Sequence, residues 1–174
     1  MTSSNIHVRF ATAADAELIA DMSRKTFVDT FGPANTKQDM DSFMNEVFTR
    51  EALIKEVGAP ENTFLLAYDG EQPVGYVRMR EGEKHPQFNG SSSMEIARIY
   101  AVQSHLGKGV GKALMQRCVE IAREQQVEIL WLGVWEKNFA AIAFYTKWGF
   151  TRFSEHDFAI GKDVQTDWLM MKQV

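Results

Sequence analysis

Three glycines stand close together in the segment Leu106-Gly107-Lys108-Gly109-Val110-Gly111-Lys112. A glycine backbone can turn tightly and approach a bulky anion, because no side chain stands in the way. The segment leads into an apolar pattern with helical spacing, so the N–H groups of the first helical turn would point at that anion. Lys108 and Lys112 could add positive charge. The segment therefore predicts a phosphate-binding loop at the start of a helix.

Several kinds of site use such a loop, and a lone glycine motif is weak evidence for any of them. A glycine-rich turn that only starts a helix is the simplest alternative. A Rossmann dinucleotide site needs its glycines after the first strand of a βαβ unit, whereas these glycines follow the fourth predicted strand. A Walker loop ends in Gly-Lys-Ser/Thr, and here Lys112 is followed by Ala113. Both nucleotide-binding alternatives fit poorly.

The elements that must hold this loop are indicated by apolar periodicity and by helix-capping signals. Capping boxes at 12–15 and 36–39 predict the starts of two early helices. Two later helices are predicted over 109–125 and 138–148. Strands are predicted over 6–10, 63–68, 74–79, 96–102, 127–134, 151–160 and 167–171. This order predicts an α/β fold with a central, mixed but mostly antiparallel twisted sheet of about seven strands and about four flanking helices.

Composition limits the kind of protein. The 174 residues suffice for one well-buried domain and are too few for two, so a single domain over 1–174 is expected. The net charge of -4 provides no basic excess for binding nucleic acid. The sequence has no apolar run of membrane-spanning length, no signal core and no histidine spacing typical of a metal site. A lone cysteine, Cys118, fits a reducing compartment, so we expect a cytoplasmic protein without membrane, nucleic-acid or metal partners.

A second segment of interest follows the strand predicted at 127–134. It reads Asn138-x-x-Ala141-x-x-Phe144-Tyr145-x-Lys147-x-Gly149-Phe150, which by itself is typical of an amphipathic helix. Together, the two segments resemble the GNAT superfamily of N-acetyltransferases, whose signature Gln/Arg-x-x-Gly-x-Gly/Ala lies between the fourth strand and the third helix. The resemblance covers essentially the whole chain. One position departs from it, because Leu106 occupies the Gln/Arg place.

The resemblance implies the GNAT fold, in which strands four and five splay apart to admit the pantetheine arm of the donor. It also implies that acetyl-CoA is the co-substrate, without a metal. At Leu106 only the backbone N–H could serve, since the usual side-chain contact is lost. The residues expected to hold acetyl-CoA lie on strand four, on the glycine loop and on the helix after strand five: Ile99, Tyr100, Ala101, Leu106, Gly107, Lys108, Gly109, Val110, Gly111, Lys112, Asn138, Ala141, Phe144 and Lys147.

Acetyl transfer to an amine needs a neutral amine, a polarised thioester carbonyl and a protonated leaving thiolate. An alkylammonium ion has a reference pKa of about 10.4, so its proton must be removed at neutral pH. Tyr145 matches the family tyrosine that protonates the thiolate, and Glu95 matches the strand-four glutamate that some branches use as general base. Each has a simpler alternative: Tyr145 as a packed helix tyrosine, and Glu95 as a solvated residue at a strand start. The backbone N–H of Ile99 is expected to polarise the carbonyl.

The acceptor is indicated by three segments, 26–31, 131–138 and 165–167. They resemble the bacterial PaiA-type branch, whose members acetylate spermidine and spermine. This resemblance implies a polyamine or another small amine, which acidic residues could attract. The alternatives are a protein or peptide amine as acceptor, and a protein that binds acetyl-CoA for regulation without turnover. Family members are often dimers, so a homodimer is one state the chain could adopt. The residues expected to contact the acceptor are Phe27, Asp29, Phe31, Trp135 and Glu136.

Overall fold

Seven strands form one sheet in the order β1-β2-β3-β4-β5-β7-β6 in the computed structural model, which describes residues 5–174. Only β4 and β5 are parallel, and the other neighbours are antiparallel. The mixed, mostly antiparallel sheet predicted from the sequence is therefore confirmed. The strands are β1 (Ile6–Phe10), β2 (Asn62–Asp69), β3 (Gln72–Arg80), β4 (Ser93–Ala101), β5 (Ile129–Trp135), β6 (Thr151–Ile160) and β7 (Asp163–Gln173).

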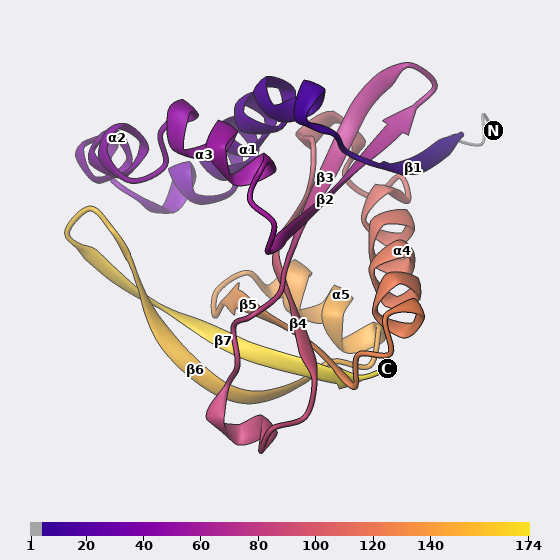
Figure 1. Cartoon of the computed structure of the whole chain (residues 1–174). Helices are drawn as coiled ribbons and strands as arrows, with labels where there is room; N and C mark the ends of the chain where they lie inside the picture. The colour runs from indigo at the N-terminus through magenta and orange to yellow at the C-terminus, as the bar shows by residue number, and fades with distance from the viewer. Residues whose placement is uncertain (1–4) are drawn as a thin grey trace.

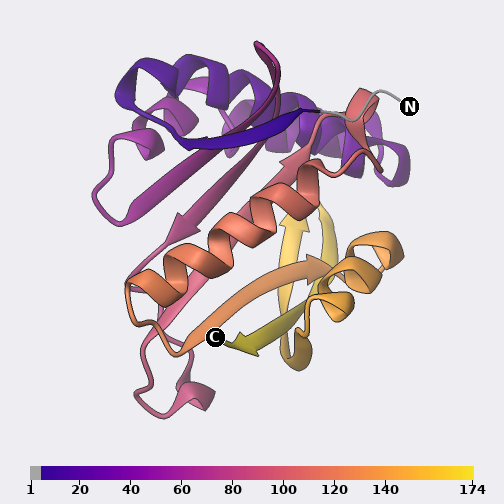
Figure 2. The same cartoon turned by 90° about the vertical axis from the view of Figure 1, so that its right-hand side faces the viewer.

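Helices cover both faces of the sheet (Figures 1 and 2). The helices are α1 (Ala16–Phe31), α2 (Lys37–Glu46), α3 (Arg50–Val57), α4 (Val110–Glu124) and α5 (Phe139–Lys147). Successive side chains of β3 point to opposite faces of the sheet. Val77 packs in the core with α4, whereas Tyr76 packs with α1 on the other face. Both predicted capping signals are present. The side chain of Thr36 accepts a hydrogen bond from the Asp39 N–H at 3.1 Å, which begins α2.

One helix was not predicted from the sequence. The eight-residue α3 begins after Thr49, whose hydroxyl accepts a hydrogen bond from the Ala52 N–H at 3.2 Å. It packs along α1 and buries Leu53 in the same cluster as Phe27. Its apolar face is too short for a clear helical period, so tertiary packing stabilises a helix that the local pattern hardly indicates. The described residues thus contain five α-helices, where about four were expected.

Gly75 in β3 allows the start of α4 and the strand β4 to approach closely. A Cβ atom at this position would lie 2.7 Å from Cγ1 of Val110 and 2.8 Å from the carbonyl oxygen of Tyr100. Both distances are far below ordinary contact, and the Tyr100 backbone oxygen cannot rotate away. The missing side chain therefore fixes where the glycine loop stands relative to the sheet.

We expect Gly75→Ala to lower the free energy of unfolding by about 1–3 kcal/mol, because the added methyl group overpacks a site that cannot expand. Urea denaturation followed by circular dichroism measures the change. Gly58→Ala is the matched control, since a Cβ there meets nothing within 4 Å and the backbone is right-handed. An equal loss in both variants would contradict the packing argument.

Candidate active site

The strands β4 and β5 run side by side only at their N-terminal ends. Their parallel pairing extends from Ser93 opposite Ile129 to Ile96 opposite Leu132. Beyond these residues β4 continues to Ala101 along β3, whereas β5 continues to Trp135 along β7. Among the described residues, no strand pairing closes the space between them. The predicted splay of strands four and five is present, and it opens a cavity of about 1030 Å³.

A β-bulge in β4 decides which side chains face each side of the sheet. Arg98 pairs with Arg78 and Ile96 pairs with Met79, so Ala97 is the extra residue. As a result, Ile96 packs in the core with α4, whereas Arg98 forms an ion pair of 2.8 Å with Glu56 of α3. Both sides of β4 therefore contribute to the cavity, which passes through the opening in the sheet.

The glycine loop forms one end of this cavity. Gly107 and Gly109 have φ angles of 75° and 88°, in the left-handed region that favours glycine. Gly109 is the N-cap of α4, and this helix start has neither a side-chain cap nor an acidic residue in its first turn. The N–H groups of the first turn therefore have no side-chain partner in the described structure, which is the arrangement that binds an anion.

His105 anchors this loop, a role that no pattern in the sequence indicates. Its Nε2 atom lies 3.1 Å from Oδ2 of Asp69, at the turn between β2 and β3, and its Nδ1 atom lies 2.9 Å from the Ser104 hydroxyl. The His105 side chain is 11% exposed, so these two contacts hold a largely buried ring. The anchor ties the segment before the glycines to the sheet.

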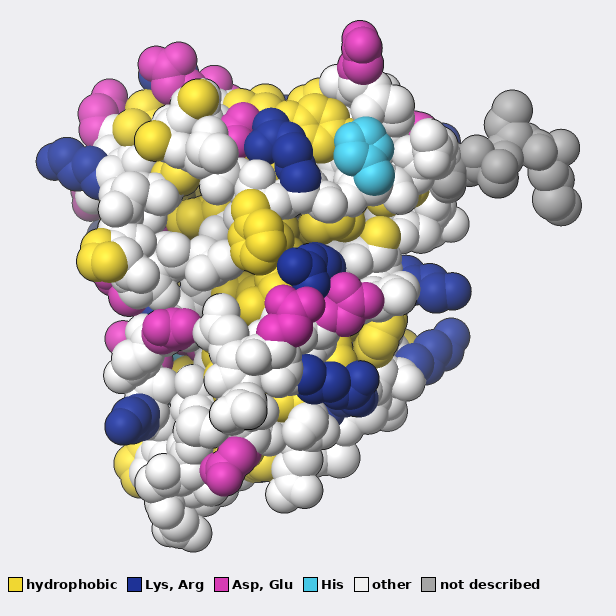
Figure 3. Space-filling model, turned by 45° about the vertical axis from the view of Figure 1, so that its right-hand side comes forward, with side chains coloured by type: hydrophobic (Ala, Val, Ile, Leu, Met, Phe, Trp, Pro, Cys, Tyr) yellow, Lys and Arg dark blue, Asp and Glu magenta, His cyan; other side chains and the backbone are white. Residues whose placement is uncertain are grey.

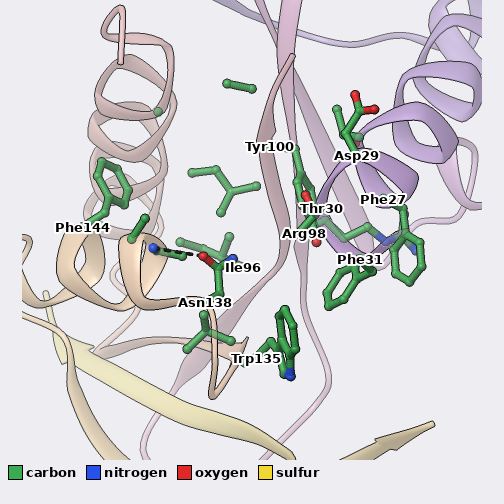
Figure 4. A pocket seen from close by; sticks show the side chains of 18 of the residues that line it. Phe27, Asp29, Thr30, Phe31, Ile96, Arg98, Tyr100, Trp135, Asn138 and Phe144 are labelled. Carbon is green, nitrogen blue, oxygen red and sulfur yellow. Dashed lines mark hydrogen bonds between the residues drawn. The ribbon is translucent and has the colours of Figure 1, made fainter. Parts of the chain in front are cut away.

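The helix α5 borders the same cavity. Asn138 is its N-cap, and its Oδ1 atom accepts a hydrogen bond from the Ala141 N–H at 3.3 Å (Figure 4). Its Nδ2 group is therefore the part left to reach a ligand. Tyr145 is 8% exposed and also lines the cavity. Burial raises the pKa of its phenol, so the hydroxyl keeps its proton at neutral and mildly alkaline pH.

The opposite end of the cavity is aromatic. Phe27 and Phe31 of α1 have ring centroids 4.5 Å apart, and Trp135 at the end of β5 lies 5.6 Å from Phe31. These three side chains and Arg98 stand around the same region in Figure 4. Asp29 also lines the cavity, but both of its carboxylate oxygens lie 3.0 Å from Nζ of Lys25. The predicted aromatic residues therefore lie together, and the predicted acidic residue is already paired.

Most of the predicted site residues meet at this cavity. The predicted residues that line it are Phe27, Asp29, Phe31, Ile99, Tyr100, Ala101, Leu106, Gly107, Gly109, Gly111, Lys112, Trp135, Asn138, Ala141, Phe144 and Tyr145. Others that line it were not predicted as site residues, notably Arg98 and Asp167. The cavity therefore joins the glycine loop, α5 and the aromatic end in one continuous space.

Five predicted site residues are not among those that line the cavity: Glu95, Lys108, Val110, Glu136 and Lys147. The Val110 side chain is buried in the core against β3, whereas Lys147 is exposed on α5. The carboxylate of Glu95 accepts two hydrogen bonds from Arg80, at 3.0 Å from Nε and 2.6 Å from Nη2. Glu95 is thus bound to a neighbouring strand, and the structure does not bring it to the space where a substrate would lie.

Acidic and basic side chains are interspersed on the face shown in Figure 3, with hydrophobic side chains visible between them. Within residues 5–174, no group of three or more histidine, cysteine, aspartate or glutamate side chains is placed to hold a metal ion. None of the helices in that range is long and apolar enough to cross a membrane.

Comparisons with known proteins agree with this geometry. The model of the Acetyltransferase (GNAT) family matches residues 24–150. A protein of Lactobacillus delbrueckii subsp. lactis, named as an uncharacterized N-acetyltransferase in the pepI 3' region, is 41% identical over 157 residues. That match covers 90% of this chain and 90% of the Lactobacillus protein.

Two solved structures with a bound coenzyme share the fold. The PaiA N-acetyltransferase of Thermoplasma acidophilum in complex with coenzyme A has a TM-score of 0.77 at 20% identity, covering 98% of this chain and 99% of that one. The structure of yncA from Salmonella typhimurium with its cofactor acetyl-CoA has a TM-score of 0.72 at 18% identity, covering 97% and 93%. Since the family model covers most of the chain and the Lactobacillus relative matches nearly its whole length, this chain belongs to the GNAT family of N-acetyltransferases.

Proposed function

We propose that this N-acetyltransferase takes the acetyl group from acetyl-CoA and transfers it to a primary amine by direct attack, with both substrates bound together. One observation carries the proposal: a single cavity of about 1030 Å³ extends from the glycine loop, past Tyr145, to the aromatic end. A donor and an acceptor can therefore meet without leaving the protein, and no covalent acetyl-enzyme is needed.

In this proposal the pyrophosphate of acetyl-CoA lies against the N–H groups of the glycine loop and the first turn of α4. The positive φ angles of Gly107 and Gly109 and the uncapped helix start support that role. Lys112 adds charge at the same end, and Leu106 contributes through its backbone. The pantetheine arm follows the unpaired edge of β4 over Ile99–Ala101, opposite Asn138.

The chemical step requires a proton for the departing thiolate, and Tyr145 is the proposed donor. The amine nitrogen attacks the thioester carbon, a C–N bond forms, and the C–S bond breaks. The thiolate then receives the phenolic proton, which burial keeps on the oxygen by raising the pKa of Tyr145. The N–H of Ile99 is proposed to stabilise the negative charge that develops on the carbonyl oxygen.

The acceptor in this proposal is a polyamine or another small amine whose cationic head lies at the aromatic end. Aromatic ring faces attract an ammonium ion, and the neighbouring, tilted rings of Phe27 and Phe31 border the cavity. Arg98 supports a second candidate, an amino acid or peptide amine that also carries a carboxylate. Its guanidinium lines the cavity, and its Nη1 atom is buried with no hydrogen-bond partner among the described residues.

Thiol release from acetyl-CoA tests this proposal across spermidine, spermine, aliphatic diamines, amino acids and short peptides. We expect release above the rate without amine for at least one of these primary amines, and mass spectrometry should find a single added acetyl group on that amine. Preference for spermidine would support the polyamine acceptor, whereas preference for a carboxylate-bearing amine would support the role of Arg98. Tight binding of CoA with no release for any amine would contradict turnover and indicate a regulatory binding protein.

A further inference from the structure

Asp167 and His156 have no role in the acetyl transfer proposed above for Tyr145 and Ile99. Asp167 lies on β7 and lines the cavity, and His156 is its direct neighbour on β6. The Nε2 atom of His156 is 3.4 Å from Oδ2 of Asp167. We infer that Asp167 binds the ammonium group of the acceptor and accepts its proton, and that His156 passes this proton to solvent. The inference rests on the proposed function, because it assigns groups to the amine half of that reaction.

The strand register places the carboxylate of Asp167 at the acceptor end of the cavity. Trp135 of β5, Asp167 of β7 and His156 of β6 are consecutive neighbours across the sheet. On β5, Gly133 has no side chain beside this row, and a Cβ atom there would be in ordinary contact with Cδ2 of Leu169 at 3.4 Å, Oδ2 of Asp167 at 3.7 Å and Nε2 of His156 at 3.8 Å. Gly133 lines the cavity as well. The carboxylate therefore borders the acceptor side of the cavity beside the indole of Trp135, with no intervening side chain on β5.

Asp167 and His156 differ in exposure, as the inner and outer groups of a proton relay should. The side chain of Asp167 is 17% exposed, whereas that of His156 is 52% exposed. Burial raises the pKa of Asp167, against a lowering by the imidazole of His156, so this carboxylate holds a proton more strongly than an ordinary aspartate. The inner group can thus take a proton from a bound amine, and the outer group is in contact with water.

Two tyrosines line the same cavity as Asp167, namely Tyr100 and Tyr145. Tyr100 faces it from β4, and burial raises the pKa of that phenol, with smaller contributions in the same direction from Tyr76, Tyr145 and Asp167. The proposed acid Tyr145 and the carboxylate Asp167 therefore line the same cavity as Tyr100. An amine bound to Asp167 would have its proton acceptor, the Asp167 carboxylate, on one side. The CoA thiolate, which receives a proton from Tyr145, would lie on the other side.

The proton balance of the reaction requires such a second group. An alkylammonium carries three N–H hydrogens, and the amide product keeps one. One of the remaining two reaches the CoA thiol by way of Tyr145. The last is released to solvent, and Asp167 followed by His156 supplies its route. Glu95 is less suited to this task, because its carboxylate is paired with Arg80 and does not line the cavity.

Asp167→Asn tests the binding step without relying on turnover. The probes are n-butylamine, which is cationic at neutral pH, and its neutral product N-butylacetamide, each titrated into the CoA-saturated enzyme. We expect the variant to bind n-butylamine about tenfold or more weakly, since a charge-assisted hydrogen bond is lost. Binding of N-butylacetamide and of CoA should stay within about twofold.

Turnover of the best amine provides the second readout. Asp167→Asn should lower kcat about 100-fold, in the range of a lost general base. His156→Gln should lower kcat about tenfold while the KM for the amine stays within about twofold, because the relay acts after binding. Asp157→Asn is the matched control, since this exposed carboxylate lies on β6 next to His156 but does not line the cavity. It should leave both kcat and n-butylamine binding unchanged.

The inference would be overturned by equal binding of n-butylamine to wild type and Asp167→Asn, or by a loss of rate in Glu95→Gln but not in Asp167→Asn. If Asp167→Asn does not fold, Asp167→Glu keeps the charge on a longer side chain. It should retain n-butylamine binding and lose rate, and loss of that binding would count against the inference. Failure of the wild-type enzyme to release thiol with any amine would refute the proposed function. The titration with n-butylamine would still decide whether Asp167 binds an ammonium group.

Discussion

Replacing Tyr145 with phenylalanine is expected to lower kcat about 100-fold or more, since the change removes the proton donor for the thiolate. The affinity for CoA should stay within about twofold, because the ring keeps its packing. That ring lies 5.6 Å from Phe144 and 6.0 Å from Phe150, contacts that do not involve the hydroxyl. Thiol release under saturating substrates measures the rate, and calorimetry with CoA measures the affinity.

Tyr68→Phe is the control for this substitution. Its hydroxyl accepts a hydrogen bond from Arg9 at 2.9 Å on the β1 side of the sheet, and the residue does not line the cavity. This variant should keep the wild-type rate. If Tyr145→Phe also kept it, the thiolate would take its proton from another source, and Tyr145 would be a packing residue only.

Replacing Gly109 with valine is expected to weaken CoA binding about tenfold or more, as the branched side chain would stand in the phosphate cradle. Gly109 lines the cavity, and a Cβ at this position meets no other protein atom within 4 Å, so the added group would occupy open space beside the loop. The φ angle of 88° also costs about 1–2 kcal/mol of stability for a residue with a side chain. Calorimetry with CoA measures the affinity, and thermal unfolding measures the stability.

Gly82→Val separates these two effects. Gly82 has a φ angle of 90° and a Cβ position that is equally open, but it does not line the cavity. Both variants should lose similar stability, and only Gly109→Val should lose affinity for CoA. A similar affinity in the two variants would contradict the placement of the pyrophosphate at the glycine loop.

The parts of the fold that could be predicted follow local rules. Three signals each act within a few residues of chain: the strand–turn–strand pattern of β2 and β3, the capping residue Thr36, and the glycine loop before α4. The loop and the motif on α5 then identified the family because their order and spacing are specific. Gly107, Gly109 and Asn138 do border one cavity, and their role in binding the donor stays a prediction.

The acceptor end depends on register and on irregularities that composition does not encode. The extra residue Ala97 in β4 decides that Glu95 faces Arg80, and a bulge leaves no sequence signal at this position. Asp167 and His156 are paired through the hairpin that joins β6 to β7. The last strand was predicted to begin at 167, whereas β7 begins at Asp163, so the facing residues could not be inferred.

Two-substrate initial-rate kinetics test the central claim, that one cavity holds donor and acceptor together. The measurement uses the best amine of the thiol-release panel at several fixed concentrations of acetyl-CoA. Double-reciprocal lines should converge, since the amine attacks acetyl-CoA within a ternary complex. Parallel lines, together with an acetyl group covalently attached to the enzyme in the absence of amine, would contradict direct transfer.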